Sequence, residues 1–187
     1  MKGLKKMYYA PFLYPYQYQQ NPYYANVPMY NYVRQPNYWT QSPNGRNKIE
    51  LRDYGSKPFV VNINEATKQN NTYRTALWTG EHLQVTLMSI NVGEDIGLEI
   101  HPNVDQFLRI EQGQGIVQMG KRKDRLNFAR NVFDDSAIMI PAGTWHNVTN
   151  TGTIPLKLYS IYAPPEHPFG TVHLTKADAL AAEEDLR

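Results

Sequence analysis

The chain has 187 residues and a net charge of +2, and no apolar run in it approaches the roughly 18 residues of a membrane-spanning helix. A charge so close to neutral does not indicate a nucleic-acid or anionic-membrane partner. Cysteine is absent, which excludes disulfides, thiolate metal ligands and cysteine nucleophiles. We expect a soluble protein with one sizeable core, in which imidazole, carboxylate or amide groups would hold any metal.

Residues 1–47 differ in composition from the rest of the chain. They are rich in Tyr, Pro, Asn and Gln and hold ten of the fourteen tyrosines. Their prolines exclude long helices and central strands, and no helical or strand period runs through them. We predict a disordered low-complexity tail. The alternative is an adhesive tether, because the composition is similar to that of Tyr-rich tails in bacterial spore-coat and surface proteins.

The N-terminus lacks the features of a targeting signal. Lys2, Lys5 and Lys6 provide a basic start, but Pro11 and Pro15 interrupt the next segment, and no small-residue cleavage site is found. We therefore expect a cytoplasmic protein, with a spore-coat or cell-surface assembly as the alternative.

Residues 48–187 form the second predicted domain. From Ser56 onward, short β-branched and aromatic runs are separated by Gly, Asn, Pro and Asp, as in strands joined by turns. Many short strands at this spacing are typical of an all-β sandwich or barrel. The predicted strands are Phe59–Ile63, Tyr73–Trp78, Leu83–Val92, Gly97–His101, Gln106–Glu111, Gly115–Met119, Leu126–Arg130, Ala137–Ile140, His146–Asn150 and Leu156–Tyr162.

Two segments are predicted to be helical, a short one at Glu65–Gln69 and a C-terminal one at Lys176–Leu186. The second has a clear start, with Thr175 as N-cap and Asp178 three residues later. An apolar stripe of this helix should dock against the barrel, and it consists of Ala177, Leu180 and Ala181.

Four side chains that can bind a metal lie on two short segments. On the strand predicted to end at His101, Glu99 and His101 project from one face, about 7 Å apart. Gln106 begins the next predicted strand, and its amide oxygen can bind a hard or borderline cation. His146 follows the Pro-Ala-Gly turn at residues 141–143, which permits a sharp change of direction. The pattern predicts a divalent metal site.

These segments resemble the two motifs of the cupin superfamily. The first motif reads glycine, five residues, His-x-His, three or four residues, glutamate, six residues and glycine, and the matching positions are Gly93, Glu99, His101, Gln106 and Gly113. The second reads glycine, five residues, Pro-x-Gly, two residues, histidine, three residues and asparagine, and here it is Asp135, Pro141, Gly143, His146 and Asn150. The resemblance covers about residues 57–187 and implies a double-stranded β-helix, or jelly-roll barrel.

Two positions depart from the cupin pattern, since Glu99 replaces a histidine and Gln106 replaces the glutamate. One carboxylate is nevertheless kept at the site, so a divalent ion is still the expected cofactor. Two imidazoles with one carboxylate are typical of non-haem iron sites, which favours Fe over Mn, Ni or Zn. The alternative is a lost site, in which Glu99 and Gln106 are merely hydrogen-bonded polar residues.

The expected function is that of a small metal-dependent enzyme, with oxygenase chemistry favoured over isomerase or lyase chemistry. His167 and His173 lie in a Pro-rich segment that could cover the barrel mouth as a lid, and they are candidate catalytic proton-transfer groups. One alternative is a non-catalytic binding or structural cupin tethered by its tail. Another is a sugar-phosphate isomerase, which needs basic groups near the metal, whereas Arg109 is predicted to face away from Gln106.

The expected partners are a small-molecule substrate and a second copy of the chain. Small cupins commonly form dimers, and the outward-facing side chains Leu98, Ile100 and Phe107 are apolar enough to need a covering surface. No phosphate-binding loop and no nucleophile elbow occur in the sequence.

Overall fold

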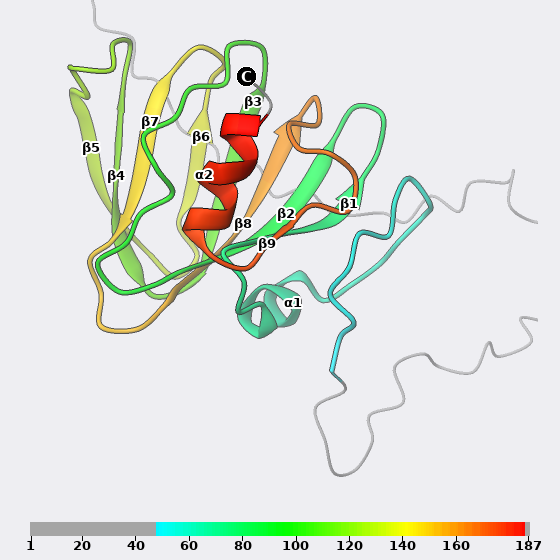
Figure 1. The fold of residues 1–187 in the computed structure, drawn as a ribbon. Coiled ribbons are helices and arrows are strands. Elements are labelled where there is room, and N and C mark those ends of the chain that lie inside the picture. Colours follow the sequence, from blue (N-terminus) through cyan, green and yellow to red (C-terminus); the bar gives the residue numbers. More distant parts are fainter. Residues whose placement is uncertain (1–47, 186–187) are drawn as a thin grey trace, which may run out of the picture. The chain divides into compact units, whose positions relative to one another are not determined.

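The computed structural model describes residues 48–185, so the predicted tail at residues 1–47 lies outside the described residues. Within this range the chain is mostly β, with a short helix before the first strand and another at the end (Figure 1). The elements are α1 (Ile63–Gln69), β1 (Arg74–Thr79), β2 (Gln84–Ile90), β3 (Asp105–Gln112), β4 (Gln114–Gly120), β5 (Phe128–Phe133), β6 (Ala137–Ile140), β7 (Trp145–Asn150), β8 (Leu156–Ala163), β9 (Val172–His173) and α2 (Lys176–Asp185).

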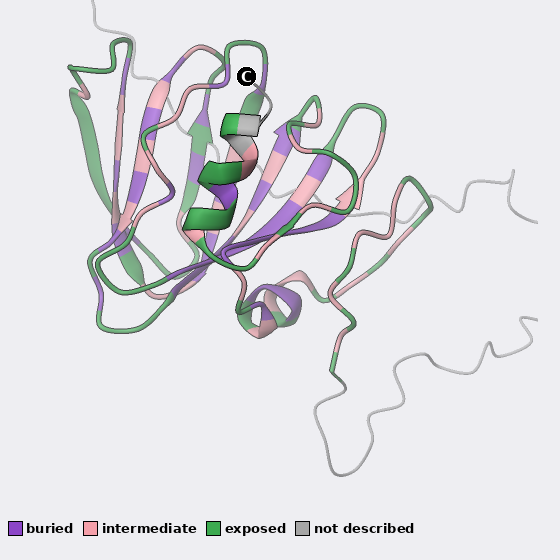
Figure 2. Ribbon diagram, in the orientation of Figure 1, coloured by how far each residue is buried: buried purple, intermediate pink, exposed green. Residues whose placement is uncertain are grey.

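The strands form two antiparallel sheets, ordered β6-β3-β8-β2-β1-β9 and β5-β4-β7. The main core cluster joins the two sheets, because it contains Leu108 and Leu158 from the first and Val117 and Val148 from the second. Figure 2 shows buried residues along most strands, whereas β5 is largely exposed. The predicted all-β jelly-roll architecture is thus confirmed.

Most predicted strands lie within about two residues of an observed one, but two predictions are wrong. Residues 59–63 are not a strand; Phe59 stacks on Tyr54 with ring centroids 4.0 Å apart, and α1 already begins at Ile63. Residues 97–101 form only one isolated bridge, between Glu99 and His146. Gly97 has a φ of +88°, which is incompatible with a regular strand.

The C-terminal helix starts as predicted but docks differently. Thr175 Oγ1 accepts a hydrogen bond from Asp178 N at 3.2 Å, and Asp178 Oδ2 accepts one from Thr175 N at 2.8 Å. The predicted apolar stripe is wrong, since Leu180 is 50% exposed and Ala179 instead enters the core. No helix among residues 48–185 has the length and apolar character needed to cross a membrane.

The tight turns lie at the positions that the sequence motifs predict. Gly93, Gly113 and Gly143 all have positive φ, at 78°, 95° and 69°, which glycine adopts without steric cost. Asp135, which occupies the place of a motif glycine, has a φ of 69° as well. Aspartate tolerates this conformation better than most residues, so the turn survives the replacement.

Candidate metal centre

The bridge between the two motif segments sets the position of Glu99. Glu99 N donates to His146 O, and His146 N donates to Glu99 O, each at 3.0 Å. A second bridge joins Asp95 to Thr149, so residues 95–99 run antiparallel beside β7. Directly paired residues in an antiparallel arrangement project to the same side. This pairing therefore turns the Glu99 carboxylate and the His146 imidazole toward each other.

The turn at residues 141–143 fixes the third side chain. Gly143 N donates to the carbonyl oxygen of His101 at 2.9 Å, and Ala142 N donates to Asp105 Oδ1 at 2.8 Å. Both hydrogen bonds tie the second motif to the first. The turn thus holds His101 opposite His146, with ring centroids 5.5 Å apart.

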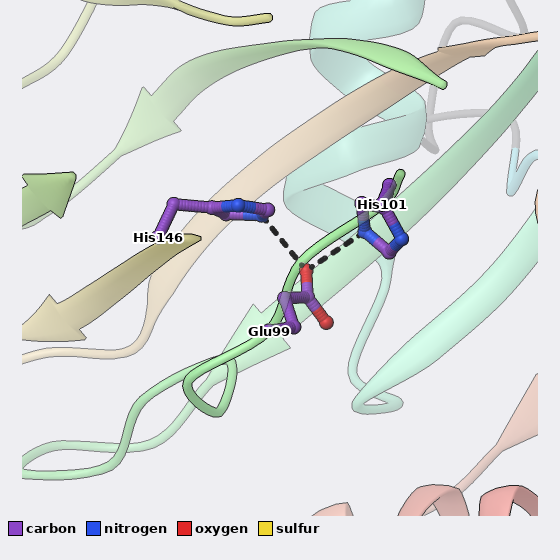
Figure 3. Close-up of side chains that lie close together, drawn as sticks. All are labelled: Glu99, His101 and His146. Carbon is purple, nitrogen blue, oxygen red and sulfur yellow. Dashed lines mark hydrogen bonds and ion pairs between the residues drawn. The ribbon is translucent and has the colours of Figure 1, made fainter. Parts of the chain in front are cut away.

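Glu99, His101 and His146 converge on one point, as Figure 3 shows. One ligand atom from each lies within 4.8 Å of the other two. Glu99 Oε1 is 3.2 Å from His146 Nε2 and 3.4 Å from His101 Nε2. Both histidines are buried, whereas the Glu99 side chain keeps 19% of its surface exposed.

The other ring nitrogen of each histidine already has an acceptor. His146 Nδ1 donates to the carbonyl oxygen of Thr144 at 2.9 Å, and His101 Nδ1 lies 3.0 Å from Glu166 Oε1. When Nδ1 carries the ring proton, Nε2 presents a lone pair. In this tautomer the two Nε2 atoms and the Glu99 carboxylate can together bind one cation, whereas a ring that donates from Nε2 to Glu99 carries a proton on both nitrogens.

The close contacts among Glu99, His101, His146 and Glu166 shift the pKa values of Glu99 and His101. Burial alone would raise the pKa of Glu99, but hydrogen bonds from His101 and His146 hold that pKa well below its usual range. Burial alone would lower the pKa of His101, but its hydrogen bonds with Glu166 and Glu99 raise that pKa to about 9. Without another cation, His101 therefore takes up a proton to balance the two carboxylates.

Gln106 also faces the inside of the barrel. It is 3% exposed, and on the neighbouring strand it pairs with Tyr162, whose ring centroid lies 5.7 Å from that of His101. Neither Gln106 Oε1 nor Gln106 Nε2 has a hydrogen-bond partner among the described residues. Buried amides are rarely left without a partner, so Gln106 is a candidate fourth ligand beside a donor set that fits a divalent metal.

Comparison with known proteins agrees with this geometry. The model of the cupin domain matches residues 86–162, which include all four predicted metal ligands. The uncharacterized protein YrkC of Bacillus subtilis (strain 168) is 68% identical over 193 residues, covering 95% of this chain and 100% of that protein. This chain belongs to the cupin superfamily.

A similar protein of known structure supports the architecture. The crystal structure of BH2720 from Bacillus halodurans is 71% identical, with a TM-score of 0.70 and coverage of 70% of this chain and 99% of that one. A protein of Acanthamoeba polyphaga mimivirus, L612, is 44% identical over 119 residues, or 63% of this chain and 72% of that protein. None of these names states an activity, so the function of this cupin rests on its site.

Of the two other predicted histidines, His167 lies near the candidate metal ligands, and His173 pairs with Arg74 at the edge strand β9. The ring of His167 contacts that of Tyr162 edge to face, with centroids 5.1 Å apart. His167 is anchored through its backbone, since its N–H and its carbonyl oxygen both bond to the Gln84 side chain, at 2.9 and 2.8 Å. Burial, followed by the charge of Arg74, lowers the pKa of His167 to about 3 and also lowers that of His173. Both histidines are therefore neutral at pH 7.

Two residues of the site were missed by sequence reasoning, namely Glu166 and Arg74. Glu166 precedes His167 in the predicted lid, and only the fold shows that its carboxylate reaches His101 Nδ1. Such an outer partner orients a metal-binding imidazole and raises its basicity. Arg74 lies on β1 and is 2% exposed. In the sequence, Arg74 stands out only as a charged residue inside a predicted strand. Alternation alone does not tell which face of that strand is buried.

Proposed function

We propose that this cupin is a metal-dependent enzyme that acts on a small molecule, with Glu99, His101, His146 and Gln106 as the metal ligands. The observation that supports it most strongly is the convergence of two buried imidazole Nε2 atoms on the Glu99 carboxylate. The Thr144 carbonyl oxygen and the Glu166 carboxylate contact the Nδ1 atoms of His146 and His101. These contacts orient both rings so that Nε2 is available to a metal.

The ligand set favours oxygenase chemistry. Two imidazoles and a carboxylate suit Fe(II) better than Mn, Ni or Zn, and such sets leave coordination positions open. When bound there, a divalent ion supplies Lewis-acid or redox chemistry to a substrate oxygen or to dioxygen. Around the ion, the Tyr162 ring packs edge to face against His101 and the His167 ring against Tyr162, and burial raises the pKa of the Tyr162 phenol to about 12. Tyr162 is thus a neutral hydrogen-bond donor.

Elemental analysis tests the metal proposal. Purified wild type is expected to contain about one divalent ion per chain, with iron favoured, because a four-ligand site saturates at one ion. His101→Ala and His146→Ala should each lose most of that metal, since each removes a ligand that the others cannot replace. His82→Ala is the matched control, because the His82 side chain is 86% exposed and the residue lies outside both motifs.

Undiminished metal in both ligand variants would overturn the assignment. Absence of metal from wild type, purified without chelators and offered Fe(II), Mn(II), Ni(II) and Zn(II) in turn, would favour a non-catalytic binding or structural cupin.

We further propose that the chain forms a homodimer through the outer face of the six-stranded sheet. Phe107 pairs with Met139 on β6 and with Ile161 on β8, so the three apolar side chains share the face opposite Leu108 of the core. Met139 is 65% exposed. Light scattering at micromolar concentration should give the mass of two chains for wild type and of one chain for Met139→Lys. A single-chain mass for wild type would contradict the proposal.

A further inference from the structure

We propose that Gln84 is a positioning residue for the metal centre, because it anchors the segment that brings the Glu166 carboxylate to His101. That segment is the lid, residues 164–171, which connects β8 to β9 (Figure 1). Gln84 and the lid lie outside residues 86–162, where the chain matches the cupin domain. The inference rests on the proposed function and deepens it, since it adds a residue that controls how His101 presents Nε2 to a metal.

The Gln84 side chain binds both main-chain polar groups of His167. Its Oε1 accepts from His167 N at 2.9 Å, and its Nε2 donates to His167 O at 2.8 Å. Gln84 is fully buried at the start of β2 and pairs with Tyr162 on β8, so both side chains lie on the same face of the sheet. The amide therefore fixes the main chain of the lid at the residue that follows Glu166.

A hydrogen-bond network fixes the orientation of the Gln84 amide. Nε2 also donates to Thr79 Oγ1 at 2.9 Å, and Thr79 Oγ1 gives its single proton to Asp53 Oδ2 at 2.6 Å. The hydroxyl therefore accepts from Gln84, so the NH2 group faces Thr79 and the His167 carbonyl. Asp53 Oδ2 also accepts from Gly170 N at 3.0 Å, so the same network holds the lid at a second residue.

The composition of the lid makes this anchor important. Three of its eight residues are prolines, which lack an N–H group with which to hold the main chain: Pro164, Pro165 and Pro168. The Glu166 side chain is 31% exposed, so water competes for its carboxylate. A fixed main chain lowers the entropy cost of keeping that carboxylate 3.0 Å from His101 Nδ1. We therefore expect the contact to weaken when Gln84 is replaced.

A double-mutant cycle of Zn(II) affinity, measured by competition with a fluorescent chelator, tests the inference. Zn(II) is air-stable and binds to imidazole and carboxylate ligands. Glu166→Ala should lower the affinity about 10- to 100-fold, as the loss of an outer partner of a metal ligand does, and Gln84→Met about 10-fold. The double variant should match Glu166→Ala within about twofold, because Gln84 acts through Glu166. A merely structural role for Gln84 would lower the affinity equally in both backgrounds.

Nuclear magnetic resonance of the metal-free protein provides a readout that needs no metal. The Nδ1–H proton of His101, buried and in contact with Glu166, should give a slowly exchanging signal in wild type, assigned by its absence from His101→Ala. This signal should vanish in Gln84→Met. The Nδ1–H signal of His146, which donates to the carbonyl oxygen of Thr144, should persist and is the internal reference.

Asn150→Leu is the matched control for both measurements. It also replaces a buried amide that makes three hydrogen bonds, but these bonds go to Ile90, Gly152 and Ile154 and not to the lid. Zn(II) affinity and the His101 signal should therefore stay at the wild-type level in the folded molecules.

Three results would overturn the inference: wild-type Zn(II) affinity in Gln84→Met, an equal loss when Gln84→Met is added to Glu166→Ala, or a His101 signal that is absent from wild type or persists in Gln84→Met. If wild type binds no Zn(II), the proposed function fails, and the His101 signal alone decides the role of Gln84. If Gln84→Met does not fold, Gln84→Glu replaces it with the same expected and contrary results, because a carboxylate accepts from His167 N but cannot donate to His167 O.

Discussion

Glu99→Gln should lower the affinity of the protein for a divalent metal by about 100-fold or more, since outer-shell changes alone cost 10- to 100-fold. Glu99 supplies the single carboxylate among the proposed ligands, and its Oε1 lies between the two imidazole Nε2 atoms. The neutral amide keeps the size of the side chain but removes the negative charge that balances the ion. Competition with a fluorescent chelator measures the affinity.

A second substitution tests whether metal affinity depends on the carboxylate charge itself or on its position at residue 99. Adding Gln106→Glu to Glu99→Gln returns a carboxylate to the site at the position where the cupin pattern has one, and should restore most of the affinity. Glu94→Gln is the matched control, because Glu94 is an exposed carboxylate in the same loop. Full metal affinity in Glu99→Gln would show that the carboxylate is dispensable and that a purely neutral ligand set holds the ion.

Asn150→Leu should reduce the free energy of unfolding by about 3 kcal/mol or more, because each unsatisfied buried polar group costs about 1–3 kcal/mol. Asn150 is 1% exposed, and its side chain makes three hydrogen bonds. Its Nδ2 donates to the carbonyl oxygens of Ile90 and Ile154 at 3.0 and 2.9 Å, and its Oδ1 accepts from Gly152 N at 2.9 Å. Leucine has a similar volume but removes the Asn150 partner of all three backbone groups.

Urea denaturation followed by circular dichroism measures the change. Asn131→Leu, at an exposed position of β5, is the control and should alter stability little. A loss below about 1 kcal/mol for Asn150→Leu would mean that water replaces the three hydrogen bonds at little cost. Metal content per folded molecule should stay at the wild-type level, since Asn150 stabilises the loops and is no ligand.

The sequence predicts the positions of most strands and of the candidate metal ligands because both depend on patterns among neighbouring residues. Alternation, turn residues and motif spacing are properties of neighbouring residues, so β6 was predicted with its exact bounds and the turn before His146 at its observed place. Errors arose where tertiary contacts prevail over propensity. Phe59 lies in a strand-like sequence but stacks on Tyr54. The core position of Ala179 is not predicted, because the periodicity of α2 does not determine the angle at which the helix docks.

The sequence alone therefore specified an all-β cupin barrel and the residues that approach the candidate metal centre, because both depend on short-range patterns. Only the tertiary structure placed Glu166 on His101 and turned Arg74 toward the inside of the barrel. Glu166 is 65 residues from His101 along the chain, and the inward direction of β1 depends on its pairing with β2 and β9. Contacts between distant segments are set by sheet register and loop closure, which no local pattern encodes.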